Sequence, residues 1–528
     1  MKPSKILAAL LALTLLLTAC GTKPAEQTPQ PTEYPAPTAP TYTSVTEILL
    51  NDSGITVDGT PVTTDASAPV YTAQDIVYYE AGKDFTYGEG SEKDAHTSEE
   101  AATHTVVHIT KAGAYSLSGK LSLGQIAVDL GDDAKNDPNA VVALILNGID
   151  ITCQVAPAII FYNVYECGDD DAEKATKDVD TTAAGANVIV ADDTVNTVNG
   201  AYVARIYKPD SVVLNEDQTE VEDAKKLHKY DAAFYSKRSM NIFGGEKNNG
   251  VLNIKAENEG LDSELHLTVN GGNINIQSGN DGINTNEDGV SLTTIDGGNL
   301  NIKVTGETGE GDGIDSNGWL VINGGTVTAY ACSNSGDSGI DSDMGIHLVG
   351  GTVLATGNML DRIEDGGQTY AVFNFAQRQT GGQTVTLKND KGEGIMDATP
   401  ENAYSILLFS SPQLTAGTYT LWSNGNQLAG SGGMMGGQGM RPGGMERPEG
   451  NRQPPEGFTP PEGFTMPEGE QPPEDFTFPQ NGERPEKPQG NRPVGFNGNA
   501  TDAQQLSPDF TIQDGGNQFS GISLFTQT

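Results

Sequence analysis

The 528-residue sequence is poor in cysteine, histidine, tryptophan and basic residues. It has 4 Cys, 6 His and 2 Trp, and its 30 Lys and Arg face 71 Asp and Glu, which gives a formal charge of −41. Three cysteines remain besides Cys20, and this odd number excludes a fully paired disulfide scaffold. Cys153 and Cys167 could form one disulfide or stay buried thiols. The negative charge disfavours nucleic acid and anionic lipid as partners and favours divalent cations.

The N-terminus has the pattern of an export signal. Lys2 and Lys5 precede an apolar run over residues 6–17, which is too short to span a membrane as a mature helix. Cys20 follows small residues and resembles a bacterial lipobox, so residues 1–19 are predicted to be a lipoprotein signal peptide. A plain signal peptide with a chance cysteine is the alternative. We expect lipidation of Cys20, a Thr/Pro-rich linker over residues 20–45, and anchoring at the extracellular face of the bacterial membrane.

A pair of adjacent glycines recurs at nearly constant spacing in the middle of the chain. The pairs begin at residues 244, 271, 297, 324 and 350, so successive steps are 27, 26, 27 and 26 residues. A fixed period of this length is typical of stacked structural units. Between the pairs, apolar and polar residues alternate with period two, which indicates strands. The apolar positions are Leu252, Ile254, Ile274, Ile276, Leu300, Ile302, Val304, Val327, Ala329 and Val353.

Parallel strands about 4.8 Å apart, one from each unit, would bury these side chains in a continuous stack. The sequence therefore predicts an all-β fold, a parallel β-solenoid over residues 46–425 with flanking strands. Residues 426–500 are rich in Pro, Gly and Glu and poor in aliphatic residues, so a disordered insertion is predicted there, with an interaction arm as the alternative. Residues 501–528 are again strand-like and are expected to close the same domain.

Acidic steps of the Gly-Ile-Asp type lie between the glycine pairs. Asp262, Asp315 and Asp341 each lie nine residues before the next pair, so they occupy one place in the repeat. Stacked in register, such like charges repel one another unless a cation lies between them. Calcium prefers several hard oxygen ligands in flexible geometry. We expect bound calcium, with candidate ligands Asp262, Asp281, Asn284, Asp312, Asp315, Asp337 and Asp341.

Acidic steps also occur in simple turns and in other calcium-binding motifs. Asp, Asn and Gly also form turns without any ion, and this accounts for some of the positions. An EF-hand is excluded because no loop has its pattern of alternating acids ending in Glu between helices. A calcium-binding nonapeptide β-roll is excluded because each glycine pair stands alone and the period is not a multiple of nine.

Several motifs together resemble a known family. Tyr235-Ser236-Lys237 and residues 240–254 lead into the Gly-Ile-Asp/Asn units, and residues 109–119 and 410–419 add further similarity. They resemble the bacterial carbohydrate-binding domain family of cellulose- and acidic-sugar-binding β-helix proteins, whose fold is like that of pectate lyases. The resemblance covers residues 103–422 and the last strands. It implies a right-handed parallel β-helix, bound calcium, display on the cell surface, and binding of polysaccharide without established cleavage. The sequence departs from the family at Arg238-Ser239, at Asn284 and in the long insertion.

Two function classes, and a structural spacer as a third, are consistent with these features. In the first, calcium on an acidic face bridges to an acidic, polygalacturonate-like polysaccharide, or the same face binds cellulose, without cleavage. In the second, the protein is a calcium-dependent lyase or a glycoside hydrolase; a lyase needs a Lys or Arg base near calcium, and the nearby candidates Lys237, Arg238, Lys255 and Lys303 do not share one repeat position. We expect a monomer that binds without catalysis.

Three residues are predicted to bind the polysaccharide. Trp319 falls on the outward register beside the inward Leu320 and Ile322, where its ring could stack on a sugar. A Trp held beneath a neighbouring loop is the alternative. Lys237 and Arg238 supply positive charge at the first repeat.

Overall fold

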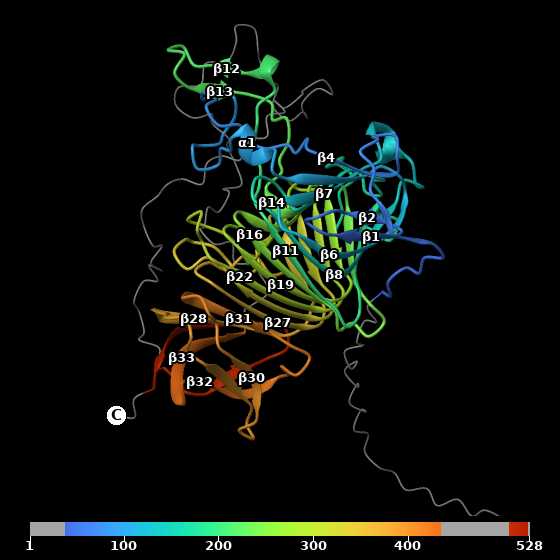
Figure 1. Cartoon of the computed structure of the whole chain (residues 1–528). Coiled ribbons are helices and arrows are strands. Elements are labelled where there is room, and N and C mark those ends of the chain that lie inside the picture. The colour runs from blue at the N-terminus through green and yellow to red at the C-terminus, as the bar shows by residue number, and fades with distance from the viewer. Residues whose placement is uncertain (1–36, 435–505, 526–528) are drawn as a thin grey trace, which may run out of the picture.

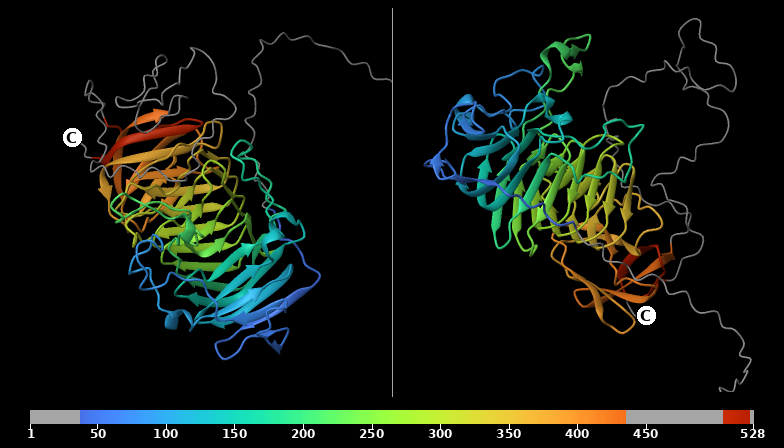
Figure 2. Two further views of the ribbon diagram at one scale, coloured as in Figure 1. Left: turned by 90° about the horizontal axis from the view of Figure 1, so that it is seen from above. Right: turned by 90° about the vertical axis from the view of Figure 1, so that its right-hand side faces the viewer.

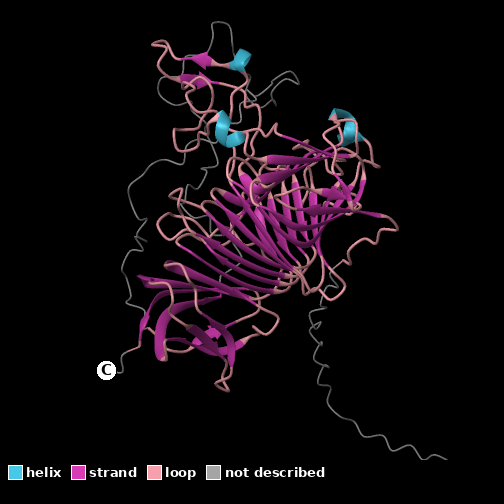
Figure 3. Ribbon diagram, in the orientation of Figure 1, coloured by secondary structure: helices cyan, strands magenta, loops and turns pink. Residues whose placement is uncertain are grey.

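A computed structural model describes residues 37–434 and 506–525 as an elongated stack of short strands (Figure 1). The all-β prediction is confirmed, because strands and loops make up nearly all of the described residues (Figure 3). The one α-helix among them, α1 (Ser98–Ala101), is a single turn, and two short 3-10 helices are η1 (Asp132–Asn136) and η2 (Pro209–Ser211). No helix within the described ranges is long and apolar enough to cross a membrane.

Most strands belong to three ladders, in which strands from successive repeats pair in parallel. Ladder 1 contains β5 (Thr105–Ile109), β7 (Gly124–Asp129), β9 (Ile159–Asn163), β14 (Ala232–Ser236), β17 (Glu259–Ser263), β20 (Ile283–Thr285) and β23 (Ile314–Ser316). Ladder 2 contains β10 (Ala186–Val190), β15 (Met240–Gly244), β18 (His266–Val269), β21 (Leu292–Ile295), β24 (Trp319–Ile322) and β26 (Gly345–Leu348). Ladder 3 contains β11 (Val195–Gly200), β16 (Val251–Ala256), β19 (Asn273–Ser278), β22 (Asn299–Val304), β25 (Thr326–Tyr330) and β27 (Thr352–Gly357).

The apolar half of the alternating pattern forms the core of this stack. Leu252, Ile274, Leu300, Val327 and Val353 lie in one register row of ladder 3, and all are fully or almost fully buried. Because side chains alternate between the two faces of a strand, the intervening polar residues point outward. The predicted inward positions are therefore correct.

The glycine pairs form the turns from ladder 2 to ladder 3. The second glycine has a positive φ in four pairs, at Gly272, Gly298, Gly325 and Gly351. L-residues with a side chain rarely adopt this conformation, so the turn selects glycine. The constant spacing of the pairs thus reflects one tight turn repeated along the stack.

The sheets are mixed rather than wholly parallel. At the N-terminal end, β8 (Val142–Cys153) pairs in parallel with β10, β11 and β6 (Gly113–Leu121), and β6 pairs with β1 (Val45–Leu50). Antiparallel pairs also occur there, between β1 and β2 (Thr56–Val57), β2 and β3 (Thr60–Pro61), and β4 (Val70–Ala73) and β5. A loop that carries the small β12–β13 hairpin (Val213–Leu214 and Val221–Asp223) projects from this part (Figure 1).

A cap of mostly antiparallel strands lies at the opposite end of the stack, as the two views of Figure 2 show. Its strand β31 pairs with β27 and so joins the cap to ladder 3. The cap has its own apolar cluster, in which Phe373 stacks on Phe519 with ring centroids 5.5 Å apart. Its strands are β28 (Tyr370–Gln379), β29 (Val385–Lys388), β30 (Gly394–Ala398), β31 (Tyr404–Ser410), β32 (Gly417–Ser423), β33 (Asn426–Met434), β34 (Phe510–Ile512) and β35 (Gly516–Leu524).

One sequence expectation needs correction. Residues 426–434, predicted as part of the disordered insertion, instead form β33 (Asn426–Met434), which pairs with β35. Of the two alternatives left open for Cys153 and Cys167, the structure has free thiols, and Cys332 is also a free thiol. Burial raises the pKa of both Cys153 and Cys167 to about 12. The predicted signal peptide, Cys20, most of the linker and residues 435–505 lie outside the described residues.

Candidate functional site

The acidic steps lie side by side on ladder 1. The register aligns Asp262 with Asn284 and Asn284 with Asp315, and a bridge between Ile314 and Ile340 brings Asp341 next to Asp315. The row continues to Tyr235 on the other side of Asp262. The neighbouring residues Leu261, Ile283 and Ile314 are completely buried in the core, so this row points away from it. The predicted acidic ladder is therefore present.

Three carboxylates of the ladder form a compact group. One oxygen from each of Asp312, Asp315 and Asp341 lies within 4.8 Å of the other two. The Asp312 side chain also accepts a hydrogen bond of 2.6 Å from the backbone N–H of Ser338. All three side chains are buried. Such a group is stable only if protons or a cation offset its charge.

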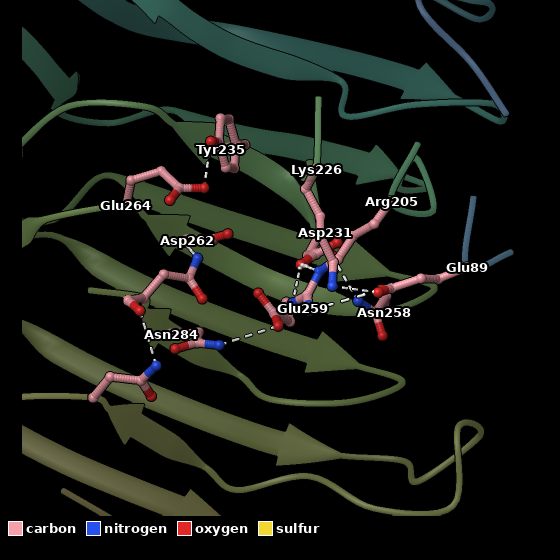
Figure 4. A network of polar contacts seen from close by, with 12 residues as sticks. Glu89, Arg205, Lys226, Asp231, Tyr235, Asn258, Glu259, Asp262, Glu264 and Asn284 are labelled. Carbon is pink, nitrogen blue, oxygen red and sulfur yellow. Dashed lines mark hydrogen bonds and ion pairs between the residues drawn. The ribbon is translucent and has the colours of Figure 1, made fainter. Parts of the chain in front are cut away.

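A second group lies farther along the ladder, at Glu259, Asp262 and Asn284 (Figure 4). The Asn284 amide donates to Glu259 Oε1 at 3.1 Å, and the Asn286 amide donates to Asp262 Oδ1 at 2.8 Å. The remaining oxygens, Glu259 Oε2, Asp262 Oδ2 and Asn284 Oδ1, are buried without a hydrogen-bond partner. Their residues are only 4%, 0% and 7% exposed. Unsatisfied buried acceptors are costly, so a bound cation would stabilise this group.

The pKa values reflect the crowding of negative charge. Burial, with nearby Asp231, raises the pKa of Glu259 from its ordinary 4.5 to about 8. Burial and neighbouring carboxylates also hold the pKa values of Asp262, Asp281 and Asp312 well above the usual range for aspartate. Burial is the larger cause in each of these groups. The donor set consists of carboxylate and amide oxygens alone, which fits a hard cation such as calcium.

The other two candidate ligands have backbone partners. Asp281 accepts a hydrogen bond from the Asp312 N–H, and Asp337 accepts one from the Gly311 N–H, each at 2.6 Å. Both bonds join one repeat to the next, so Asp281 and Asp337 already serve to connect neighbouring repeats. Neither belongs to the compact group of three carboxylates.

The carboxylates of the acidic ladder are buried, which corrects the expectation of an exposed acidic face. An acidic face that bridges through calcium to a polymer requires exposed carboxylates, but those of the ladder are 0–8% exposed. Segments far away in the sequence contribute to the surroundings of the ladder. Arg205 donates to the buried Asp231 at 2.9 Å, and Lys226 contacts Glu89 at 2.6 Å in the same network (Figure 4). A cation held by the ladder would thus lie beneath the surface.

A pocket of about 410 Å³ opens beside the ladder, at the turns from ladder 1 to ladder 2. We call it the corner pocket. Lys237 and Arg238 line it, as predicted for a binding site, and three further cations join them. Its charged lining residues are Lys135, Lys226, Lys229, Lys237 and Arg238 with Glu166, Asp169, Asp170, Glu264 and Glu287.

Some charged groups of the corner pocket have partners within the protein and others do not. Glu166 accepts hydrogen bonds from Gly168 and from the backbone and hydroxyl of Ser239, and Asp169 is paired with Lys174. By contrast, within the described part of the chain Lys135, Lys237 and Arg238 form no ion pair. The pocket therefore holds three cations without an ion-pair partner, in a lining whose five basic and five acidic residues balance in formal charge.

Tyr235 connects the corner pocket to the acidic ladder. Its backbone pairs with Asp262, and its hydroxyl donates to Glu264 at 2.7 Å. Tyr230 packs edge-on against Tyr235 with ring centroids 5.3 Å apart, and His228 stacks on Tyr230 at 4.2 Å. Burial lowers the pKa of His228 to about 4, so its ring is neutral at physiological pH. These rings give the pocket an aromatic wall.

The remaining predicted residues lie elsewhere. Trp319 starts β24 with its side chain outward and half-buried, but it does not line the corner pocket. Lys255 and Lys303 lie on ladder 3, so the candidate bases are divided between two sheets. The sequence interpretation missed Glu259 and Glu264 as parts of the site, although both lie within the first acidic step. It also missed Lys226 and Lys229, for which the irregular loop before β14 carries no repeat signal.

Comparisons with known proteins gave one family match and one similar solved structure. The sequence model of a family described as carbohydrate-binding domain-containing protein matches residues 103–370, just over half of the chain. A solved structure of a polysaccharide lyase-like protein from C. thermocellum, a gadolinium derivative, is similar with a TM-score of 0.35 and 20% identity. That similarity covers 59% of this chain and 90% of the other. No curated protein matches the chain.

Proposed function

The chain belongs to the carbohydrate-binding domain-containing protein family, and from this premise we propose that it binds acidic polysaccharide in the corner pocket without cleaving it. The carrying observation is the group of available cations, Lys135, Lys237 and Arg238, in a protein of charge −41. Uronate carboxylates would pair with these cations through charge-assisted hydrogen bonds. Tyr230 and His228, stacked on each other, form the aromatic wall of this pocket.

We propose that calcium stabilises the face beside this pocket. Asp312, Asp315 and Asp341 would hold one ion, and Glu259, Asp262 and Asn284 another. Both groups have oxygen donors and too much negative charge, and the second has buried oxygens without partners. When bound, the cation supplies the missing positive charge. Tyr235 pairs with Asp262 of the ladder and donates a hydrogen bond to Glu264 of the corner pocket, so the position of the ladder affects the wall of the pocket.

We propose that the three ladders form a right-handed parallel β-helix. Successive strands enter ladders 1, 2 and 3 in turn through short connections, and each ladder is parallel. Connections between parallel strands of one sheet are nearly always right-handed, because strands have an intrinsic twist.

A calcium-dependent lyase or a glycoside hydrolase is the alternative function, and a structural spacer is another. Lyase chemistry requires a cation that touches the uronate, but the burial of the ladder carboxylates favours a cation beneath the surface. We expect the purified protein to be retained on immobilised polygalacturonate in calcium, with no release of unsaturated products or reducing ends. Sustained release of either product would establish an enzyme instead. Absence of retention would leave the spacer as the better explanation.

We propose that the protein is anchored to the outer face of the membrane through lipid on Cys20. The support is the sequence pattern around this residue. Cys20→Ala should move the protein into the medium or leave unprocessed precursor, because the acyl chains provide the membrane affinity. Fractionation with an antibody measures this, and Cys167→Ala serves as the matched control. Equal membrane retention of both variants would contradict the anchor.

A further inference from the structure

The corner pocket contains as many acidic as basic residues, five of each. Carboxylates in the wall of a binding site repel a ligand that carries only negative charge. A purely anionic sugar therefore matches the basic part of this lining and leaves the acidic part unmatched.

The acidic residues of the pocket fall into two groups. Glu166 and Asp169 have partners within the protein, through hydrogen bonds and an ion pair respectively. Glu264, Glu287 and Asp170 form no ion pair with any residue in the described part of the chain. The pocket thus holds carboxylates, as well as cations, that are open to a charged ligand.

Glu264 and Glu287 lie on successive repeats, just after strands β17 and β20 of ladder 1. The Tyr235 hydroxyl donates to Glu264 at 2.7 Å, which orients this carboxylate at the pocket wall (Figure 4). Burial raises the pKa of both glutamates above the ordinary 4.5, and Lys229 offsets only part of that effect. A further positive group beside them would stabilise their ionised form.

An unpaired cation lies one strand step away from Glu264. Ser236 pairs with Ser263 in ladder 1, so Lys237 and Glu264, which follow them, have backbones about 4.8 Å apart. Both residues line the pocket, and neither belongs to an ion pair among the described residues. The wall therefore presents a positive and a negative group side by side.

We propose that the acidic sugar unit bound in the corner pocket also carries an amino group, so that the pocket recognises a zwitterionic sugar. The carboxylate of this unit pairs with Lys237 and Arg238, and its ammonium group pairs with Glu264 and Glu287. The inference rests on the proposed function, because it names the kind of acidic sugar that the same site takes. The volume of about 410 Å³ lies within the roughly 300–1,000 Å³ usual for small-ligand sites, which suits a short part of a polymer.

A zwitterionic unit also avoids a cost that a polyanion meets. The formal charge of −41 repels a chain of carboxylates as it approaches the protein. A unit whose ammonium balances its carboxylate has no net charge, so this repulsion disappears while the pairs formed inside the pocket remain.

Two sugars that differ in the charge of one nitrogen test the inference. Muramic acid has a carboxylate and a free amine, whereas N-acetylmuramic acid has the carboxylate and an uncharged amide. At about pH 7, below the ordinary pKa of an α-amino group, the free amine is mostly protonated. In a ligand-detected NMR titration, the purified protein should bind muramic acid about tenfold more tightly than N-acetylmuramic acid, because only the first forms both sets of charged hydrogen bonds. Glucosamine, which lacks the carboxylate, should bind as weakly as N-acetylmuramic acid.

The double variant Glu264→Gln with Glu287→Gln should abolish the preference for muramic acid and leave the affinity for N-acetylmuramic acid unchanged. Glutamine at position 264 keeps an acceptor for the Tyr235 hydroxyl, and Glu287 bonds to Ser291 through its backbone. The comparison of the two sugars in the parent protein requires no variant, so it stands even if the double variant fails to fold.

Glu216→Gln with Glu310→Gln is the control, because it removes the same charge from exposed positions that do not line the pocket. It should keep the preference. Equal affinity of the parent for the two muramic sugars overturns the inference, and retention on polygalacturonate in that case leaves the proposed function standing. A preference that survives in the pocket variant, or glucosamine bound as tightly as muramic acid, also overturns it. Preference that depends on the two glutamates, without retention on polygalacturonate, would support the inference and refute a polygalacturonate-like ligand.

Discussion

Removal of calcium is expected to destabilise the protein by about 3 kcal/mol for each site that was held at a hundredfold excess over its dissociation constant. The physical reason is that chelation leaves the carboxylates of Asp312, Asp315 and Asp341 close together and buried. Thermal unfolding in millimolar calcium and in excess chelator measures the effect. Identical melting curves in the two conditions would contradict the proposed calcium sites.

The variant Asp312→Asn gives a second test, because its effect on the free energy of unfolding should have opposite signs with and without calcium. It keeps an oxygen for the bond from the Ser338 N–H but removes one negative charge. At pH 8 it should therefore stabilise the chelated protein by relieving repulsion, and destabilise the calcium-loaded protein by weakening the site. Asp288→Asn is the control, since Asp288 is exposed and bonds only to Asn317 at 2.9 Å. Asp231 would be a poor control because it is buried and paired with Arg205.

The stability of the fold should depend on pH in opposite ways with and without calcium, because of the carboxyl groups of the acidic ladder. The pKa of Glu259 is raised from 4.5 to about 8, and those of Asp262, Asp281 and Asp312 are also raised. Without a cation, the folded state then binds more protons than the unfolded state, so this stability is fully present below the ordinary carboxyl pKa and is lost as pH rises to about 8. Calcium requires the deprotonated groups, so in its presence stability should rise over the same window. Equal slopes in calcium and chelator would contradict this account.

Removal of the corner-pocket cations is expected to reduce binding of polygalacturonate by a hundredfold or more. Hydrogen bonds to charged groups contribute about 1.5–3 kcal/mol each, and Lys237→Ala with Arg238→Ala removes two such donors. Retention should also fall with rising salt, because part of the attraction is between exposed charges. Elution at increasing polymer and salt concentration measures both effects.

A control double variant distinguishes binding in the corner pocket from a general effect of the protein's net charge. Lys208→Ala with Lys391→Ala removes the same charge from exposed positions that do not line the corner pocket. This control should bind polygalacturonate within about twofold of the parent, since distant surface charges are screened. If both double variants lose affinity equally, attraction is a property of overall charge and the corner pocket is not the site.

Much of the repeat region could be predicted from the sequence, for a specific reason. In a parallel ladder, residues one period apart become neighbours, so a spacing in the sequence is directly a contact in space. The rows form although their steps vary, 22 and 26 residues for Leu252, Ile274 and Leu300 and 22 and 31 residues for Asp262, Asn284 and Asp315, because each strand carries its own apolar alternation or Gly-Ile-Asp type of step. Even the longer turn after Asn284 left the register intact, because the apolar Ile283 keeps its place in the core.

The sequence by itself thus determined the all-β class, the repeating strands and the acidic ladder. Only the tertiary structure decided that the ladder is buried, that cations from the loop before β14 join Lys237 and Arg238, and that β34 and β35 return to the cap across residues 435–505. These features depend on irregular segments that dock on distant parts of the chain. Such docking follows shape and charge, and no period in the sequence records it.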